Sequence, residues 1–457
     1  MSLPGITQPS RPSDPAASLN AAQWRVVLLL MAFAFLCHFN RVGMSVAGTE
    51  RLMTEYKLSE EQMGAVYSTY LVIYTILMIP GGWLIEKVGP RWALGLMGIG
   101  SAVLVSLTGV PGWGLIPAAL ALPAFLLVRG VLGAVTVAMH PGAARSVSLW
   151  IHPTGRAWGN GMVTGAALLG ISATYWLFGL LMDKLTWPGA FLAAGVATLA
   201  LTVVWLATTT DRPAEAGLDL TSTRTENEEA NDEAGAAATE LEVGQAGMST
   251  APNVIGFSAI ADLLRNRSLS LIAISYGAYS YFQYLFFYWV EHYFLKILAV
   301  SKEQSRVYSM IVMLTMAVGM IFGGYLSDKL QALWGARRGR AAVAICGMTV
   351  STIFAVVGVH LEQLNWVVAC FALAMGTLGM CEGPFWTTAV ELGGARGGLA
   401  GAILNTGGNI GGTLAPFATP FFVHYFESWQ VGIEVACVIC AIGAILWFWI
   451  TPPIAQN

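Results

Sequence analysis

Two arginines lie inside long apolar stretches of this 457-residue chain. Arg41 follows an apolar run that begins at Val26, and Arg129 is surrounded by Leu, Val and Gly. A guanidinium at such a position costs about 3 kcal/mol or more unless it meets an anion, a partner group or water. Its planar fork of donors suits a carboxylate. We therefore expect both arginines to bind an anionic ligand in a central cavity; the alternative is a pin between helices, against a carbonyl, an amide or a buried acid.

Three further side chains are candidate proton carriers. His38 shares a helical face with Arg41, His140 lies near Arg129 in the sequence, and a histidine changes charge between about pH 5 and 8. Glu382 directly precedes Gly383-Pro384, and an acid at membrane depth either titrates or pairs with a cation. Glu382 is the leading candidate. The alternative for each histidine is a polar residue satisfied within a packed helix.

Other polar residues suit a hydroxylated ligand. Gln283 and Tyr284 lie in an aromatic run whose rings would stack on a sugar face, although an aromatic belt at the membrane surface is the alternative and explains Tyr288. Asn405 and Asn409 lie one turn apart and would bind hydroxyl groups or join two helices. The full set of candidate ligand-binding residues is Arg41, Arg129, Asn40, Tyr74, Gln283, Tyr284, Asn405 and Asn409.

The elements that must position these residues are membrane-spanning helices. The chain is 56% hydrophobic and only 11% charged, against about 25% charged in a soluble domain. Its apolar blocks approach the 20 or so residues that cross a bilayer. Hydropathy and helix breakers predict an all-α membrane protein with twelve helices, six on each side of a gap. Their ranges are 24–48, 63–86, 91–111, 115–141, 157–183, 188–209, 268–297, 304–327, 340–360, 365–390, 396–423 and 428–451.

An acidic segment separates the two groups of predicted helices, and with the two tails the chain has five parts. The segment 211–251 holds ten acids and two arginines, so that the net charge of −3 becomes +5 without it. We expect a tail over 1–23, bundles over 24–209 and 258–451, a disordered acidic linker over 210–257, and a tail over 452–457. Fifteen Lys and Arg residues fall in the segments on the side of the termini, against six on the other side. This bias predicts a multi-pass protein of a cell membrane, inner or plasma, with both termini cytoplasmic.

The sequence contains none of the motifs that we looked for as signs of a soluble enzyme. The sequence has no nucleotide-binding P-loop, zinc-ligand spacing or nucleophile elbow, and its six cysteines lie in apolar stretches. We expect no enzymatic activity, no cofactor, no metal and no nucleic-acid partner.

A repeated element marks both halves. The second predicted helix ends in Pro80-Gly81-Gly82-Trp83 and then Glu86-Lys87, with Arg91 beyond, and the eighth ends in Gly323-Gly324 and then Asp328-Lys329. Small residues allow close helix approach, and the charges can join neighbouring helix ends. We expect a conformational gate formed by Gly82, Glu86, Lys87, Arg91, Asp328 and Lys329.

This repeated element resembles the cytoplasmic loop signature of the major facilitator superfamily. Within it, the run Asn40-Arg41-Val42-Gly43-Met44 and the run Ile79-Pro80-Gly81-Gly82-Trp83 resemble the anion:cation symporter branch, whose members carry hexuronates, aldonates and other organic anions. Arg129 with Leu132-Gly133, and the run Gly407-Gly408-Asn409, resemble the same branch. Asn40 and Thr136 stand where this branch has the two acids linked to proton coupling. Coupling therefore cannot be transferred to these positions.

The resemblance implies a monomeric secondary active transporter in the lipid bilayer, with two bundles that expose a midplane site to each side in turn. Its substrate would be a small organic anion, a sugar acid or another carboxylate, moved with protons. The alternatives are an exporter, exchanger or facilitator of a neutral, zwitterionic or lipophilic solute without proton coupling, and a solute sensor that does not transport.

Overall fold

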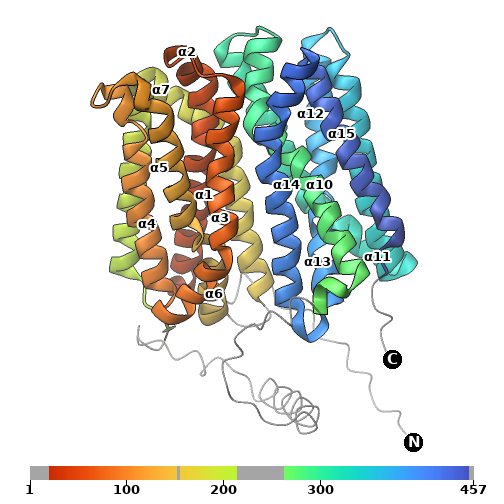
Figure 1. Cartoon of the computed structure of the whole chain (residues 1–457). Helices are drawn as coiled ribbons and strands as arrows, with labels where there is room; N and C mark the ends of the chain where they lie inside the picture. Colours follow the sequence, from red (N-terminus) through yellow and green to blue (C-terminus); the bar gives the residue numbers. More distant parts are fainter. Residues whose placement is uncertain (1–19, 152–154, 214–261, 452–457) are drawn as a thin grey trace, which may run out of the picture.

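The computed structural model describes residues 20–151, 155–213 and 262–451, and the helices of these residues gather into two bundles that stand side by side (Figure 1). The first bundle contains α1 (Ala21–Ala47), the π-helix η1 (Gly48–Leu52), α2 (Met53–Glu55), α3 (Glu60–Val88), α4 (Pro90–Leu107), η2 (Val110–Trp113), η3 (Ala118–Leu120), α5 (Ala121–Thr136), α6 (Met139–Trp150) and α7 (Arg156–Thr208). The second contains α10 (Arg267–His292), the π-helix η7 (Tyr293–Ile297), α11 (Lys302–Val359), α12 (Leu364–Gly379), α13 (Glu382–Gly393), η8 (Gly394–Arg396), α14 (Gly397–Phe426), α15 (Trp429–Leu446) and η9 (Trp447–Trp449).

Two of these helices are hairpins of two membrane-spanning segments. The backbone of α7 leaves helical geometry at Thr186, with φ 62° and ψ 166°, and that of α11 does so at Gly335, with φ 81° and ψ 161°. Conversely, α5 with α6, and α12 with α13, each form one span with a short break. Each bundle thus has six spans among the described residues, and the predicted fold class of twelve helices is confirmed.

The same local signals begin equivalent helices in the two bundles. Ser59 caps α3 and Ser301 caps α11, and in both cases the glutamine three positions later, Gln62 or Gln304, bonds back to the serine amide. This capping box satisfies backbone N–H groups that would otherwise lack partners. A glycine with positive φ ends each of these spans, Gly89 at 85° after α3 and Gly335 at 81° at the turn within α11. The internal repeat is therefore present in local structure as well as in sequence.

Several predicted boundaries need correction. The span predicted over 115–141 continues as α6 to Trp150, because the chain resumes its helix after a break at 137–138. The segment between 327 and 340, predicted as a loop, is helical on both sides of Gly335. The predicted tails and most of the linker, 1–19, 214–261 and 452–457, lie outside the described residues.

The bundles meet along α3 and α14, which lie side by side in the centre of the molecule (Figure 1), and also along α7 with α11 and α1 with α10. We call the end at which α7 finishes and α10 begins the linker end, and the opposite end, which carries η1, α2 and the turn at Thr186, the loop end. A side chain in place of Gly64 on α3 would collide with the carbonyl oxygen of Pro416 on α14. The glycine therefore permits close contact between the bundles.

The outer surface of the bundles is suited to lipid. Large apolar side chains are exposed on many helices, among them Leu127, Ile321 and Val203. Seven stretches of helix in the described part of the chain are long and apolar enough to cross a membrane. Two of them, α7 and α11, contain two spans each, and α3, α10 and α14 supply the remaining three of the twelve. The chain is thus a multi-pass membrane protein.

Candidate functional site

Arg41 lies on α1 where the two bundles meet. Its Nε atom donates a hydrogen bond to the hydroxyl oxygen of Tyr288 on α10, at 3.2 Å. Its guanidinium lies 4.8 Å from the ring centre of Tyr284 and 5.4 Å from that of Tyr70 on α3. The Nη2 atom is buried and has no hydrogen-bond partner among the described residues. Both bundles thus contribute aromatic rings around a cation that retains an unused donor.

Arg129, on α5, is fully buried and bonds to the backbone of α1. Its Nη1 atom donates to the carbonyl oxygen of Asn40 at 3.2 Å, and its Nη2 atom donates to that of Arg41 at 2.7 Å. The guanidinium also lies 5.1 Å from the ring of Tyr70. Arg129 therefore holds the α1 backbone at the residue that presents the free donor.

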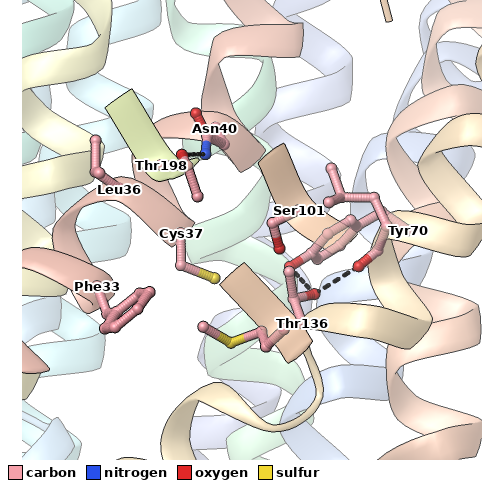
Figure 2. A pocket seen from close by; sticks show the side chains of 10 residues that line it. Phe33, Leu36, Cys37, Asn40, Tyr70, Ser101, Thr136 and Thr198 are labelled. Carbon is pink, nitrogen blue, oxygen red and sulfur yellow. Dashed lines mark hydrogen bonds between the residues drawn. The ribbon is translucent and has the colours of Figure 1, made fainter. Parts of the chain in front are cut away.

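Asn40 and Thr136, the two residues at positions where the symporter branch has acids, line one small cavity inside the first bundle (Figure 2). The cavity has about 10 Å³ of free space, enough for one water molecule. Asn40 donates to Thr198 at 2.9 Å, and Thr136 bonds to Tyr70 at 2.6 Å. Both side chains thus have neutral partners within their own bundle.

The two histidine candidates lie against each other. The ring centres of His38 on α1 and His140 on α6 are 5.4 Å apart. The Nδ1 atom of His38 lies 2.9 Å from the carbonyl oxygen of Ala34, so this nitrogen carries the proton of that hydrogen bond. His38 is half-buried and His140 is exposed.

The aromatic candidates separate into two places. Tyr284 faces Arg41, and Tyr74 stacks beside Tyr70 at 6.2 Å between ring centres. Gln283 points elsewhere, because its amide donates to the sulfur of Met316 within the second bundle at 3.6 Å. Tyr288, assigned to a surface belt from the sequence, is fully buried and accepts the bond from Arg41. That assignment was wrong.

The two asparagines of α14 have different surroundings. Asn405 donates to the sulfur of Met78 on α3 at 3.3 Å, across the interface between the bundles. Asn409 is 6% exposed, and its Nδ2 atom has no partner in the described part of the protein. Asn409 thus retains a free donor, whereas Asn405 joins the two bundles.

Glu382 begins α13, at the break in its span, and lies in the second bundle. Its Oε1 atom accepts hydrogen bonds from the hydroxyl of Tyr276 at 2.7 Å and from the indole of Trp386 at 2.9 Å. Its Oε2 atom is buried without a partner among the described residues. No Lys or Arg there forms an ion pair with it, so this carboxyl group is surrounded by donors that carry no charge.

The predicted gate residues lie at the linker end. Arg91 binds the end of α7, because its Nη2 atom donates to the carbonyl oxygen of Leu206 at 2.6 Å. Asp328 accepts from Gln331 at 3.3 Å, and Lys329 lies over the ring of Tyr325 at 4.6 Å. The surroundings of Gly82 and of the Glu86 side chain lie outside what the structure describes, and Lys87 is exposed.

An ion pair of the linker end was missed from the sequence. Arg340 of α11 forms a bidentate pair with Glu391 of α13, with Nη2 at 2.7 Å from Oε1 and Nη1 bonded to Oε2. Arg340 also donates to Gln331 at 2.9 Å. The two partners lie 51 residues apart in the sequence, which hides the pair.

The loop end carries a second missed group, which joins the two bundles. Arg306 of the second bundle donates from Nε and Nη2 to Glu50 of the first, at 2.6 and 2.7 Å, and from Nη1 and Nη2 to Asp183. His292 of α10 lies 2.8 Å from Glu60 of α3. The sequence contains only a weak signal for the group around Arg306. Glu50 lies nine residues beyond Arg41, near the end of an apolar run, but Arg306 resembles any basic residue of a loop.

Comparisons with known proteins agree with this architecture. The sequence model described as Major Facilitator Superfamily matches residues 30–403. The chain is 23% identical over 420 residues to the probable sulfoacetate transporter SauU of Cupriavidus necator, with 92% of this chain and 91% of the relative covered. It is 24% identical to the probable galactarate/D-glucarate transporter GudP of Bacillus subtilis, with 84% and 83% covered.

Solved structures share the fold. A bacterial homologue of the human lysosomal transporter Spinster, inward-facing and unoccupied, superposes with a TM-score of 0.75 at 14% identity, over 95% of this chain and 98% of that one. The inward open xylose transporter XylE from E. coli gives a TM-score of 0.68, also at 14% identity, over 95% and 98%.

Proposed function

Because the chain belongs to the Major Facilitator Superfamily, we propose that it is a secondary active transporter that moves a small organic anion, a sugar acid or another carboxylate, by alternating access. Its two bundles would turn against each other around the site at Arg41 and expose that site to each side of the membrane in turn. The names of the relatives support this substrate class, since sulfoacetate, galactarate and D-glucarate are all organic anions.

The observation that carries the proposal is the unused donor of Arg41. A buried guanidinium nitrogen without a partner is costly, and no ion pair joins Arg41 to an acid of the described residues. A substrate carboxylate would supply that partner, while Tyr70 and Tyr284 would cover the rest of the solute. In this proposal Arg129 positions Arg41, and Tyr74, Asn40, Gln283, Asn405 and Asn409 are further candidates for contact with hydroxyl groups.

The test is uptake of radiolabelled sugar acids, dicarboxylates and neutral sugars into proteoliposomes. We expect uptake of an acid, and we expect Arg41→Gln to reduce it about 100-fold, because a charge-assisted bond of about 3 kcal/mol is lost. Arg41→Lys should keep part of the activity, since the charge remains but the fork does not. Transport that survives Arg41→Gln, or a panel in which only neutral sugars move, would contradict the proposal.

Proton symport is a further part of the proposal. Glu382 is the leading carrier, because its buried Oε2 atom has no partner and its neighbours are neutral donors. His38 and His140 are the other candidates. Accumulation of an acid only under an inward proton gradient would establish symport.

One observation favours an uncoupled carrier instead. Asn40 and Thr136 are neutral and have neutral partners in the small cavity of the first bundle (Figure 2). An exchanger, exporter or facilitator of a neutral or zwitterionic solute needs no titrating group there. Acid flux that is absent, or equal with and without the gradient, would favour a carrier without proton coupling.

We also propose the surroundings of the protein. The positive charges of the predicted linker side suggest a cell membrane, inner or plasma, with both termini and the linker in the cytoplasm. The transporter would act as a monomer in the bilayer, because each chain carries both bundles and the site between them. Cysteine labelling from either side of the membrane tests the orientation.

A further inference from the structure

A buried carboxyl group at the loop end has no partner. Glu291, near the end of α10, is 0% exposed, and neither of its carboxylate oxygens has a hydrogen-bond partner among the described residues. The hydroxyl of Ser305 donates to the backbone carbonyl oxygen of Glu291 at 3.1 Å and leaves the side chain unpaired. The proposed transport mechanism so far gives this group no role.

The group next to Glu291 is the ion pair that closes the loop end. Glu50, from the first bundle, is the neighbouring acid, and Arg306 is the neighbouring base. Among the described residues, Tyr67 on α3 and Tyr175 on α7 also lie near Glu291, and their hydroxyls donate to the carbonyl oxygens of Ser45 and Phe287. Glu291 therefore lies where both bundles meet, beside two acids that are bound to one cation.

The charges here do not balance if Glu291 is ionised. All three nitrogens of Arg306 already donate to Glu50 and Asp183. Lys302 and Arg51 lie near Asp183, at 3.4 and 3.5 Å, on its exposed side. A buried ion without a partner neutralises itself rather than remaining charged, and of two acids that share a site one keeps a proton.

We propose that Glu291 is a proton-binding site that is filled when the loop end is closed. As the bundles close, a proton from water at the loop end bonds to one carboxylate oxygen of Glu291 and gives the neutral acid. When they separate, water reaches the group and takes that proton back. The inference rests on the proposed function only in that it assumes separation of the bundles at this end.

The sign of the effect follows from counting protons. The closed state binds one proton more than the open state, so acid pH favours closure and alkaline pH favours opening. The ratio of closed to open molecules then changes by up to about tenfold per pH unit while Glu291 titrates. His292, the next residue of α10, is paired with Glu60 on the same interface. The test must therefore separate the two groups.

The experiment measures the distance between spin labels at the loop end of the purified full chain in nanodiscs. Thr54 in the first bundle and Glu362 in the second are both exposed there, and each is replaced by Cys after the native cysteines have been removed. We expect the short-distance population of the parent to fall by about tenfold or more as the pH rises from about 5 to 9. In Glu291→Gln, which imitates the neutral acid, the short-distance population should remain high over this whole pH range. Glu303→Gln, at an exposed acid of the same end, and His292→Gln should keep the response.

Two results would overturn the inference: a Glu291→Gln protein that responds to pH as its parent does, and a parent that shows no response. Glu50→Gln gives an independent check, because it frees Arg306 to pair with an ionised Glu291 and should move the transition to lower pH by about one unit or more. An unchanged transition in Glu50→Gln also counts against the proposal. The measurement needs no substrate, so failure of the transport assay does not affect it.

Discussion

At the scale of single residues, the two buried arginines differ in what their nitrogens bind. Arg129 donates from both Nη atoms to backbone carbonyls of α1, and its buried Nε has no partner among the described residues. Arg41 donates from Nε to a tyrosine, and its buried Nη2 is the atom without a partner there. A guanidinium whose two Nη atoms bond to backbone secures structure, and one with a free Nη atom is available to a ligand. Of the two roles that the sequence left open for both arginines, contact between helices fits Arg129 better and ligand binding fits Arg41 better.

The first prediction concerns Arg129→Gln. This variant loses two charge-assisted bonds to α1, each of about 1.5 to 3 kcal/mol. We expect a lower thermal unfolding temperature and weaker uptake, because the backbone at Arg41 is no longer held. Arg41→Gln, in contrast, should keep its unfolding temperature and lose uptake. If Arg129→Gln kept normal stability but bound no ligand, we would conclude instead that Arg129 contacts the ligand directly.

The second prediction separates proton coupling from transport at Glu382. A glutamine at this position still accepts bonds from Tyr276 and Trp386 but cannot carry a proton. We expect Glu382→Gln to exchange labelled for unlabelled substrate at a rate within about threefold of the parent, and to lose accumulation under a proton gradient. The measurements are counterflow and gradient-driven uptake in the same proteoliposomes. Glu303→Gln, at an exposed acid of the loop end, is the matched control, and accumulation that persists in Glu382→Gln would exclude Glu382 as the carrier.

The sequence identified some site residues and missed others for a physical reason. Arg41 is visible because one charge in an apolar run stands out against its own neighbours. The partners of Glu50 cannot be found in this way, since Arg306 lies 256 residues away and reads as part of a loop. Tyr288 was misassigned because a tyrosine near a helix end suits a membrane belt as well as a buried hydrogen bond. Long-range pairing is settled only by the fold.

At the scale of the elements, close packing of α10 against α14 depends on glycine. A side chain at Gly411 would collide with the carbonyl oxygen of Gly277, and one at Gly407 with that of Ala273. These helices carry Tyr284 and Asn409, so their spacing also sets the width of the candidate site. Without a water-driven hydrophobic effect between helices, such contact is a main source of stability in a bilayer.

The third prediction follows from that contact. Gly411→Ala should destabilise the protein by about 1 to 3 kcal/mol, because the added methyl group has no room and the helices must move apart. Gly398→Ala, in the first turn of the same helix, meets nothing within 4 Å and should leave stability unchanged or slightly raised. Thermal unfolding of the two variants in one detergent gives the comparison. Equal stability would mean that the α10–α14 contact is loose.

Element types were predictable to a greater degree than their ends. Apolar length and the charges between blocks located all twelve spans, because a bilayer imposes that length on every helix. Of the breaks in the spans formed by α5 with α6 and by α12 with α13, the first was not located. Pro141 and Pro384 lie just after them, but the backbone geometry at a proline in a span depends on which neighbouring helices satisfy the freed groups.

At the scale of the whole molecule, the described contacts between charged groups of the two bundles lie at the loop end. Arg306 joins Glu50 and Asp183 there, and His292 joins Glu60. The charged pair that holds the linker end, Arg340 with Glu391, joins helices within the second bundle. The structure is therefore closed at the loop end by bonds that alternating access would have to break.

The last prediction tests that closure. Arg306→Gln leaves Glu50 buried without its cation, and breaking a buried pair costs about 3 to 5 kcal/mol. This energy favours opening at the loop end, by about 100-fold or more in the ratio of open to closed molecules. The reporter is Ser45→Cys, because Ser45 is fully buried and its hydroxyl donates to the backbone carbonyl oxygen of Tyr288 across the interface at 2.8 Å.

We expect labelling of Ser45→Cys by a membrane-impermeant maleimide, applied from the loop side, to be slow in the parent and much faster with Arg306→Gln. Arg51→Gln is the matched control, since Arg51 also pairs with Asp183 but at 3.5 Å on the exposed side, where an ion pair contributes about 1 kcal/mol or less. If Arg51→Gln and Arg306→Gln accelerated labelling equally, the charge at this end would act by general attraction and not through the buried pair. If neither did, packing of α3 against α14 would be sufficient to keep the loop end closed.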